Sequence, residues 1–340
     1  MQNIRVLVVD DSMLFRKYLV QGLNEIQGLE VVAEARDAFE ARDAIIKYRP
    51  DVMTLDIEMP KMSGLEFVKK LMPQYPLPVV MVSALDGKVF DAMQAGAVDF
   101  VSKPTSMSQE AVKNFIRQEL AVKVKIASTV KKSKLKMAAP VQHTSHSPLR
   151  SGKKEIIAIG ASTGGTEAIR QVIENFGNDI PGIVIVQHMP VGFTGMYAGR
   201  LNDICQVSVK EAQTGDVVKP GQVLIAQGDK HMRLVKVNNT YQVDCQMGEK
   251  VSGHRPSVDV LFHSVAQVAG NKALGIILTG MGRDGAEGLL AMKNAGAVTI
   301  GQDENSCIVY GMPKVAYDLG AVDYQLPLDN IANKVYQLLK

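Results

Sequence analysis

The sequence predicts an α/β protein of two domains, each built on a mainly parallel sheet. Short apolar runs, each followed by a polar loop and an amphipathic stretch, recur in both halves of the 340-residue chain, which is the pattern of βα units. The length exceeds that at which a single core usually stops growing. We expect a first domain at residues 1–120, a basic flexible linker at 121–152 and a second domain at 153–340.

The first domain is predicted from five apolar runs that follow one another at roughly 20 to 25 residues. A parallel sheet with helices on both faces accounts for this rhythm. The runs are IRVLVV, LEVVAEA, DVMTLD, LPVVMVS and AVDFVS.

The linker is predicted from a change of composition. Between Ala121 and Lys154 there are nine Lys or Arg and no acidic residue, so removing this segment turns the net charge of +3 into −6. The basic character therefore belongs to a connector, which could be helical at its start, and a nucleic-acid-binding role gains little support. His143 and His146 lie in it and are interpreted as solvated.

The second domain opens with EIIAIGASTGGTEAIRQVIENF, in which a strand runs through a Gly-rich turn into an amphipathic helix. The unit recurs in PGIVIVQHMP and NKALGIILTGMGRDGAEGLLAMKNAG. At least three strands should therefore lie parallel, with their carboxyl ends at one edge. The alternation around Asn238-Asn239 predicts an inserted antiparallel hairpin, so this domain is expected to be doubly wound and mainly parallel with one hairpin.

The chain carries no pattern of export or membrane insertion. Its N-terminus reaches two aspartates before any long apolar stretch, and its apolar runs are far shorter than a bilayer span. The cysteines, Cys205, Cys245 and Cys307, are odd in number and form no CxxC pair, which indicates neither disulfides nor zinc. We expect a cytoplasmic protein.

Acidic residues follow two strands of the first domain. Asp10 and Asp11 follow IRVLVV, and Asp56 closes DVMTLD. Gathered at one sheet edge, such carboxylates repel one another unless a hard cation such as Mg²⁺ joins them. Ser83 ends the fourth strand and Lys103 follows the fifth, and they supply the hydroxyl and the fixed cation that a transferred phosphoryl group needs. One aspartate alone would be interpreted as a helix cap.

This ordered set resembles the receiver domain of two-component response regulators over about residues 1 to 120. The resemblance implies that Asp56 accepts a phosphoryl group from a histidine kinase. It also implies that Asp11 and the backbone carbonyl of Glu58 join Asp56 on Mg²⁺, with Asp10 acting mainly through water. Phe100 stands at the position of the family's switch aromatic. It forms the receiver switch together with Ser83 and Lys103, which would contact the phosphoryl group.

A hydrolytic site is predicted in the second domain. Gly160–Gly164 fits G-x-S-x-G, which exposes a serine at a sharp strand-to-helix turn. Alone, this motif is as compatible with a phosphate or dinucleotide loop. His188 ends the next strand and Asp284 follows a third, so a nucleophile (Ser162), a base and a carboxylate should meet at one edge. Their chain order differs from that of α/β-hydrolases.

Oxyanion donors are expected from two places, the helix after the nucleophile, at Thr163, and the Gly-rich Thr279–Gly282 loop. Among the other histidines, His263 is interpreted as core packing because of its helical spacing. His231 and His254 are less clear, although the segment that starts at His254 could help to shape the site.

The segments GASTGGTEAI, QHMP, HRPSVDVLFHS and LTGMGRDGA resemble the catalytic domain of the chemotaxis protein-glutamate methylesterase family. The resemblance implies that Ser162, His188 and Asp284 form the catalytic triad and that Met281 belongs to the oxyanion region. It implies methyl ester hydrolysis on chemoreceptor glutamates, opposed by a methyltransferase, with deamidation of some glutamines and no cofactor for the esterase chemistry. Phosphorylation would shift the protein from a covered to an open catalytic edge.

Two other functions are compatible with parts of the sequence. A nicotinamide oxidoreductase would use the Y-x-x-x-K spacing of Tyr310 and Lys314, but Pro313 between them disfavours a shared helix. The alternative that stays open is a response regulator with a non-enzymatic, protein-binding output domain.

Overall fold

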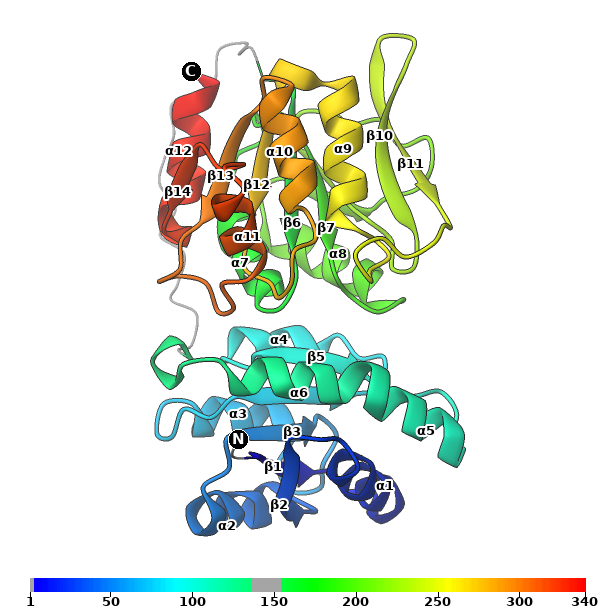
Figure 1. The fold of residues 1–340 in the computed structure, drawn as a ribbon, viewed down its shortest axis with the longest axis vertical. Helices are drawn as coiled ribbons and strands as arrows, with labels where there is room; N and C mark the ends of the chain where they lie inside the picture. The colour runs from blue at the N-terminus through cyan, green and yellow to red at the C-terminus, as the bar shows by residue number, and fades with distance from the viewer. Residues whose placement is uncertain (1–2, 136–153) are drawn as a thin grey trace. The chain divides into compact units, whose positions relative to one another are not determined.

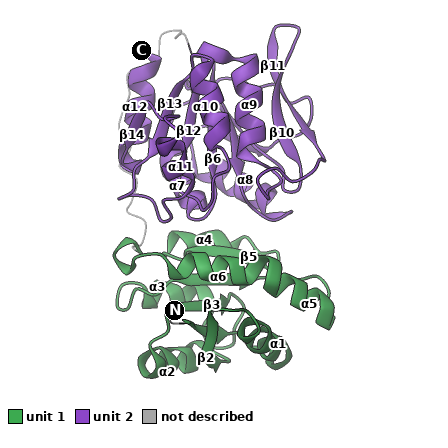
Figure 2. Cartoon of the chain, viewed as in Figure 1, with its two compact units in different colours: residues 1–139 green, residues 140–340 purple. Residues whose placement is uncertain are grey.

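The protein was analysed as a computed structural model that describes residues 3–135 and 154–340. The chain divides into two compact units, residues 1–139 and 140–340 (Figure 2). Residues 136–152 of the expected linker, with His143 and His146, lie outside the described residues.

Unit 1 is built on a five-stranded parallel sheet with the strand order β2-β1-β3-β4-β5 (Figure 1). Every residue of β3 and β4 is buried, because helices cover both faces of the central strands. The five βα units predicted from the sequence are confirmed. The strands are β1 (Ile4–Val9), β2 (Leu29–Ala35), β3 (Val52–Asp56), β4 (Val79–Ser83) and β5 (Asp99–Ser102).

Helices follow each strand of this sheet, and polar caps start most of them. The Asp37 side chain accepts hydrogen bonds from the first amides of α2, and Ser63 forms a capping box with Glu66 at α3. These local signals explain where the chain turns from loop to helix. The helices are α1 (Met13–Asn24), α2 (Ala38–Tyr48), α3 (Gly64–Leu71), α4 (Lys88–Gln94) and α5 (Gln109–Phe115).

The first unit extends beyond residue 120, at which we had placed its end. Helix α5 continues through a π-helical turn (Ile116–Leu120) into α6 (Ala121–Ser128), and a short 3₁₀ turn follows at Lys132–Lys134. Val124 and Ala127 are fully buried, and α6 packs against β3, β4 and β5. The assignment of residues 121–128 to a linker was therefore wrong, because tertiary burial gives this Lys-rich stretch a folded role that its composition did not indicate.

Unit 2 is built on a seven-stranded parallel sheet with the order β14-β13-β12-β6-β7-β9-β8. Strand β6 lies near the centre, between β12 and β7, and all its residues are buried. The strands are β6 (Ile156–Ala161), β7 (Gly182–Gln187), β8 (Ser208–Glu211), β9 (Gln222–Ile225), β12 (Ala273–Ile277), β13 (Val298–Gln302) and β14 (Tyr324–Leu326).

Helices cover both faces of this sheet (Figure 1). Helix α9 packs with α10 over β6 and β12, and α7 packs with α12. The helices are α7 (Gly165–Ile173), α8 (Phe193–Ile204), α9 (Val258–Val268), α10 (Ala286–Asn294), α11 (Met312–Asp318) and α12 (Leu328–Leu339), and a 3₁₀ turn lies at Gly270–Lys272.

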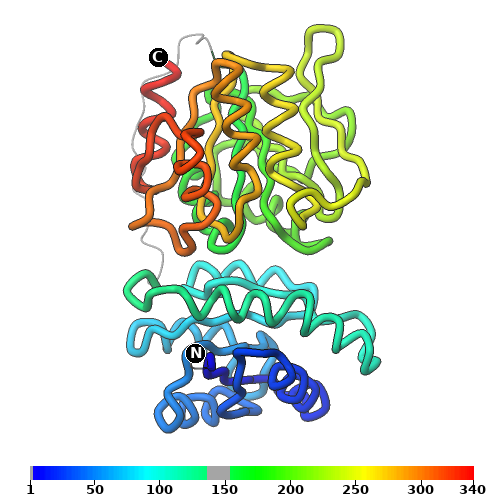
Figure 3. Tube along the Cα trace, viewed as in Figure 1, coloured from blue at the N-terminus to red at the C-terminus, as the bar shows by residue number. Residues whose placement is uncertain are grey.

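The predicted hairpin is confirmed as a separate two-stranded sheet, β10 (His231–Val237) and β11 (Thr240–Gln246). Asn238 and Asn239 both have positive φ, 47° and 65°, as its two-residue turn requires. Met232 and Leu234 join the core formed with α9, beside which Figure 3 traces the hairpin in yellow-green. None of the helices in the described ranges has the length and apolar character needed to cross a membrane.

Candidate active site

Three adjacent strands deliver polar side chains to one edge of the second sheet. Ser162 follows β6, His188 follows β7, and Asp284 lies in the loop between β12 and α10. Strand β6 is where the chain changes sides, since β7 pairs with one of its edges and β12 with the other. Such a switch point leaves a crevice at the carboxyl ends of the strands, where α/β folds bind ligands.

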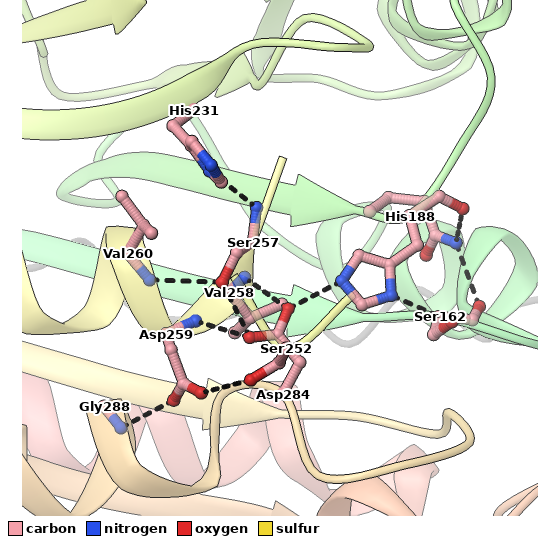
Figure 4. Close-up of polar contacts among 11 residues, drawn as sticks. Ser162, His188, His231, Ser252, Ser257, Val258, Asp259, Val260, Asp284 and Gly288 are labelled. Carbon is pink, nitrogen blue, oxygen red and sulfur yellow. Dashed lines mark hydrogen bonds and ion pairs between the residues drawn. The ribbon is translucent and has the colours of Figure 1, made fainter. Parts of the chain in front are cut away.

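The three side chains form a continuous hydrogen-bonded chain (Figure 4). His188 Nδ1 lies 3.2 Å from Ser162 Oγ, and His188 Nε2 lies 2.8 Å from Asp284 Oδ2. A carboxylate can only accept, so the Nε2 proton points to Asp284 and leaves the Nδ1 lone pair facing the serine hydroxyl. This arrangement can remove a proton from Ser162 and make it a nucleophile.

Asp284 is held as a buried anion. Its Oδ1 accepts from Ser257 Oγ at 2.7 Å and from the Asp259 amide at 3.0 Å, and its Oδ2 also accepts from the Val258 amide at 2.7 Å. Burial alone raises its pKa, but the hydrogen bond and charge of His188, with the donors at Asp259 and Ser257, outweigh it and lower the pKa to about 2. The carboxylate is therefore charged at neutral pH.

The segment at residues 254–257 was expected to help shape the site, but its role in donating to Asp284 was not recognised in the sequence. Ser257 is the N-cap of α9, and its hydroxyl also accepts from the Val260 amide. Asp259 lies behind Asp284 and accepts from the Gly288 amide at 2.8 Å. Burial and the neighbouring Asp284 charge raise the pKa of Asp259. The available signal was a serine directly before an apolar helix, which indicates a cap but not its partner.

The turn that carries Ser162 is stabilised from two sides. The amide of the buried Gln187 side chain donates to the carbonyls of both Ser162, at 2.9 Å, and His188, at 3.1 Å. Gly164 has a φ of 76° and lies so close to Ile308 that a Cβ would approach it to 2.8 Å. Glycine at this position is therefore required by backbone conformation and by space.

The two residues expected in the oxyanion region flank the nucleophile. Thr163 is buried directly after Ser162, and its carbonyl accepts from Thr279 Oγ1 at 3.0 Å. Met281 follows Gly280, which lies so close that an added Cβ would be 2.7 Å from Ser162 Cβ. Met281 is 48% exposed, and its amide donates to no group in the described ranges. This amide is available to a ligand beside Ser162.

The other histidines differ in their surroundings. His254 stacks on His188, with ring centroids 3.7 Å apart and planes 10° from parallel. His231 is buried, and its Nε2 donates to the Glu249 carbonyl at 2.7 Å while its Nδ1 accepts from the Ser257 amide at 3.2 Å. His263 is exposed on α9, so its interpretation as core packing was wrong.

Unit 1 holds a cluster of carboxylates around one lysine. Lys103 Nζ lies 2.6 Å from Asp56 Oδ2 and 2.8 Å from Asp10 Oδ2. Asp10, Asp11 and Asp56 can each offer an oxygen within 4.8 Å of the others. Burial first, and the Asp10 charge in addition, raise the pKa of Asp56 to about 6 against the opposing effect of Lys103 and the Glu58 amide. Three carboxylates thus share one lysine, which leaves the cluster with an excess of negative charge.

The remaining residues expected near this cluster lie on neighbouring strands. Ser83 is buried at the end of β4, where its carbonyl accepts from the Lys103 amide at 2.7 Å. Glu58 donates its amide to Asp56 Oδ1 at 3.3 Å. Phe100 is buried in β5 and meets the ring of Phe90 edge-on at 5.8 Å.

The residues weighed for an oxidoreductase do not share a helix. Tyr310 precedes α11, and its hydroxyl accepts from Gln325 Nε2 at 2.6 Å. Lys314 lies within α11 and pairs with Asp318 at 2.9 Å. The geometry gives that function no support.

Comparisons with known proteins agree with this geometry. A family model described as CheB methylesterase matches residues 157–335, and one described as response regulator receiver domain matches residues 6–125. A protein of Syntrophomonas wolfei named protein-glutamate methylesterase/protein-glutamine glutaminase 2 is 59% identical, covering 100% of this chain and 98% of its own. A Salmonella typhimurium protein named protein-glutamate methylesterase/protein-glutamine glutaminase is 49% identical, over 98% of this chain and 97% of its own.

One solved structure is similar to the second unit alone. The CheB methylesterase catalytic domain of Thermotoga maritima has 39% sequence identity and a TM-score of 0.53. The match covers 54% of this chain and 98% of that domain.

Proposed function

Because this chain belongs to the CheB methylesterase family, with a response regulator receiver domain ahead of the catalytic domain, we propose that Ser162, His188 and Asp284 hydrolyse methyl esters of chemoreceptor glutamates. The observation that carries the proposal is the chain from serine to imidazole to carboxylate, with contacts of 3.2 and 2.8 Å. The same site would deamidate receptor glutamines, since both reactions release a small group from an acyl carbon.

The first half of the reaction forms an acyl-enzyme. Ser162 Oγ attacks the ester carbonyl while His188 Nδ1 accepts its proton, and Asp284 stabilises the imidazolium. The amides of Thr163 and Met281 donate to the oxygen that becomes negative. Collapse of the tetrahedral intermediate breaks the bond to the methoxy oxygen, which takes the proton from His188 and leaves as methanol.

The second half restores the serine. A water molecule loses a proton to His188 and attacks the acyl carbon, and the intermediate collapses to a free glutamate side chain with the proton returned to Ser162 Oγ. With a glutamine substrate the first leaving group is ammonia. Both steps use these side chains and water, and neither step needs a metal or an organic cofactor.

Control by phosphorylation is proposed at Asp56. The acidic cluster fits Mg²⁺, because it offers three carboxylate oxygens within 4.8 Å of one another and only Lys103 to balance their charge. Asp11, Asp56 and the Glu58 carbonyl would hold the ion, with Asp10 acting through water. When bound, Mg²⁺ supplies the charge that an incoming phosphoryl group needs. Lys103 and Ser83 would then contact the phosphoryl oxygens, and Phe100 would respond by repacking.

The proposed partners follow from this chemistry. A histidine kinase supplies the phosphoryl group, the cytoplasmic helices of a chemoreceptor supply the ester, and a methyltransferase opposes the reaction. The cytoplasm is the proposed location, since it contains the kinase and keeps thiols such as Cys205 reduced. The alternative of a non-enzymatic output domain finds no support in the relatives, whose names state two activities.

The test is release of methanol from methyl-esterified chemoreceptor, with and without a small phosphodonor and Mg²⁺. The intact protein should release methanol, and more rapidly with the phosphodonor. Ser162→Ala should abolish release and change the melting temperature of unit 2 little, because the side chain is partly exposed and the substitution removes only the hydroxyl oxygen. Turnover that survives this substitution would rule out the serine mechanism.

A further inference from the structure

His254 makes a contact that the reaction described above does not use. Its ring lies face to face with the ring of His188, with a centroid distance of 3.7 Å and an angle of 10°. The two hydrogen bonds of His188 lie at the edges of its ring, toward Ser162 and Asp284. They restrain rotation within the ring plane but oppose tilting out of that plane less strongly. A ring stacked on the face opposes this tilt.

The backbone around His254 is held on both sides. Val251 and His254 exchange two backbone hydrogen bonds, of 3.0 and 2.9 Å, across a turn in which Ser252 and Gly253 have positive φ. On the other side, Arg255 Nε donates to Asp229 Oδ1 at 2.8 Å. The backbone that carries His254 is therefore held independently of the stacking contact.

The same segment also holds the carboxylate of the triad. Ser257, Val258 and Asp259 supply three of the donors to Asp284. Residues 251–259 thus place both the carboxylate that fixes one edge of His188 and the ring that covers its face. We propose that His254 is a positioning residue, which holds His188 in the orientation that reaches Ser162 and keeps water from that face when the imidazolium forms.

The inference rests on the proposed hydrolysis and deepens it. An aromatic face against the imidazolium is favourable in the manner of a cation–π contact, whereas a tilted base loses its alignment with the nucleophile. Misplacement of a catalytic group by about 1 Å costs on the order of 100-fold in rate. The effect should appear in kcat, because His254 acts on the base and not on the receptor.

The experiment compares a planar and a non-planar replacement of similar size in the full-length protein with a phosphodonor. His254→Phe should keep kcat for methanol release within about threefold of the unchanged protein, while His254→Leu should lower it by about 10- to 100-fold with KM changed less than twofold. His263→Ala removes an exposed histidine from α9 and is the matched control, with no expected change. Thermal melting verifies that each variant is folded.

A second measurement separates this inference from the proposed substrate. The rate at which a fluorophosphonate labels Ser162 depends on the base but not on a receptor, and it should fall in His254→Leu and persist in His254→Phe. If the unchanged protein labels but releases no methanol, the proposed substrate is wrong and the labelling rates still decide the role of His254. Equal rates for the Phe and Leu variants, in both assays, would overturn the inference.

Discussion

Replacing Asp284 by asparagine keeps the shape of the side chain and removes its charge. The carboxylate accepts four hydrogen bonds, from His188 Nε2 and the Val258 amide on one oxygen and from Ser257 Oγ and the Asp259 amide on the other. An amide replaces one of these oxygens with an NH₂ group. In either orientation it therefore sets a donor against a backbone N–H.

Both orientations impair the base. With the NH₂ group toward His188, the imidazole must accept at Nε2, so Nδ1 carries the proton and cannot take one from Ser162. With the oxygen toward His188 the tautomer is kept, but no charge stabilises the imidazolium, and the NH₂ group opposes the Asp259 amide that now lies 3.0 Å from Oδ1. We expect kcat to fall by about 10³- to 10⁴-fold, with a small change in KM.

The same substitution should change stability in a pH-dependent way. The folded-state pKa of Asp284, about 2, lies below its ordinary value of 3.8, so the charged form stabilises the fold by about 2 kcal/mol. This contribution is fully present above about pH 4 and is lost as the pH falls toward 2. Asp284→Asn should therefore lower the free energy of unfolding of unit 2 by about 2 kcal/mol at pH 7, and by less at pH 3.

Two measurements check these expectations. Methanol release under saturating substrate gives kcat, and urea denaturation at the two pH values gives the stability difference. Asp318→Asn, which removes an exposed carboxylate paired with Lys314, is the matched control and should change neither. A folded Asp284→Asn protein that keeps more than a tenth of kcat would refute the assigned role of Asp284.

Three further perturbations test other parts of the molecule. Asp56→Asn should remove the rise in methanol release that a phosphodonor produces while leaving the basal rate unchanged. Chelation of Mg²⁺ should remove the same rise in the protein without substitutions. An Asp56→Asn variant that a phosphodonor still activates would exclude Asp56 as the phosphoacceptor. A fragment starting near Gly152 should hydrolyse ester without a phosphodonor and faster than the unphosphorylated full-length chain, and a slower fragment would contradict inhibition by unit 1. Gln187→Leu removes two hydrogen bonds, to the carbonyls of Ser162 and His188, and should lower both kcat and the melting temperature of unit 2. The melting temperature should fall by several degrees, because a buried amide donor pair is worth about 1–3 kcal/mol. An unchanged kcat would show that the Gln187 side chain does not position the site.

Much of the fold could be predicted because its signals are local. Apolar runs bounded by polar loops indicated the strands of both sheets, and the Asn238-Asn239 pair indicated the hairpin turn. The packing of the helix at Ala121–Ser128 into the first unit was missed for the opposite reason. Its lysines suggest a solvated connector, and only contact with β3, β4 and β5 buries Val124 and Ala127.

The sequence by itself determined which residues arrive at the edge of the second sheet. Parallel strands bring their carboxyl ends together, so residues after three such strands had to meet, and Ser162, His188 and Asp284 could be selected by chemistry alone. In the same way, the sequence places Asp10 and Asp56 at one edge of the first sheet, because both follow or close parallel strands.

Only the tertiary structure decided how those residues are oriented and what surrounds them. Which imidazole nitrogen faces Ser162, the stacking of His254 on His188, and the donors that keep Asp284 charged all join segments far apart in the chain. Each depends on atomic positions defined to within a few tenths of an ångström, and those positions are set by packing of whole helices and strands. Sequence patterns carry periodicity and order, but they do not carry those distances.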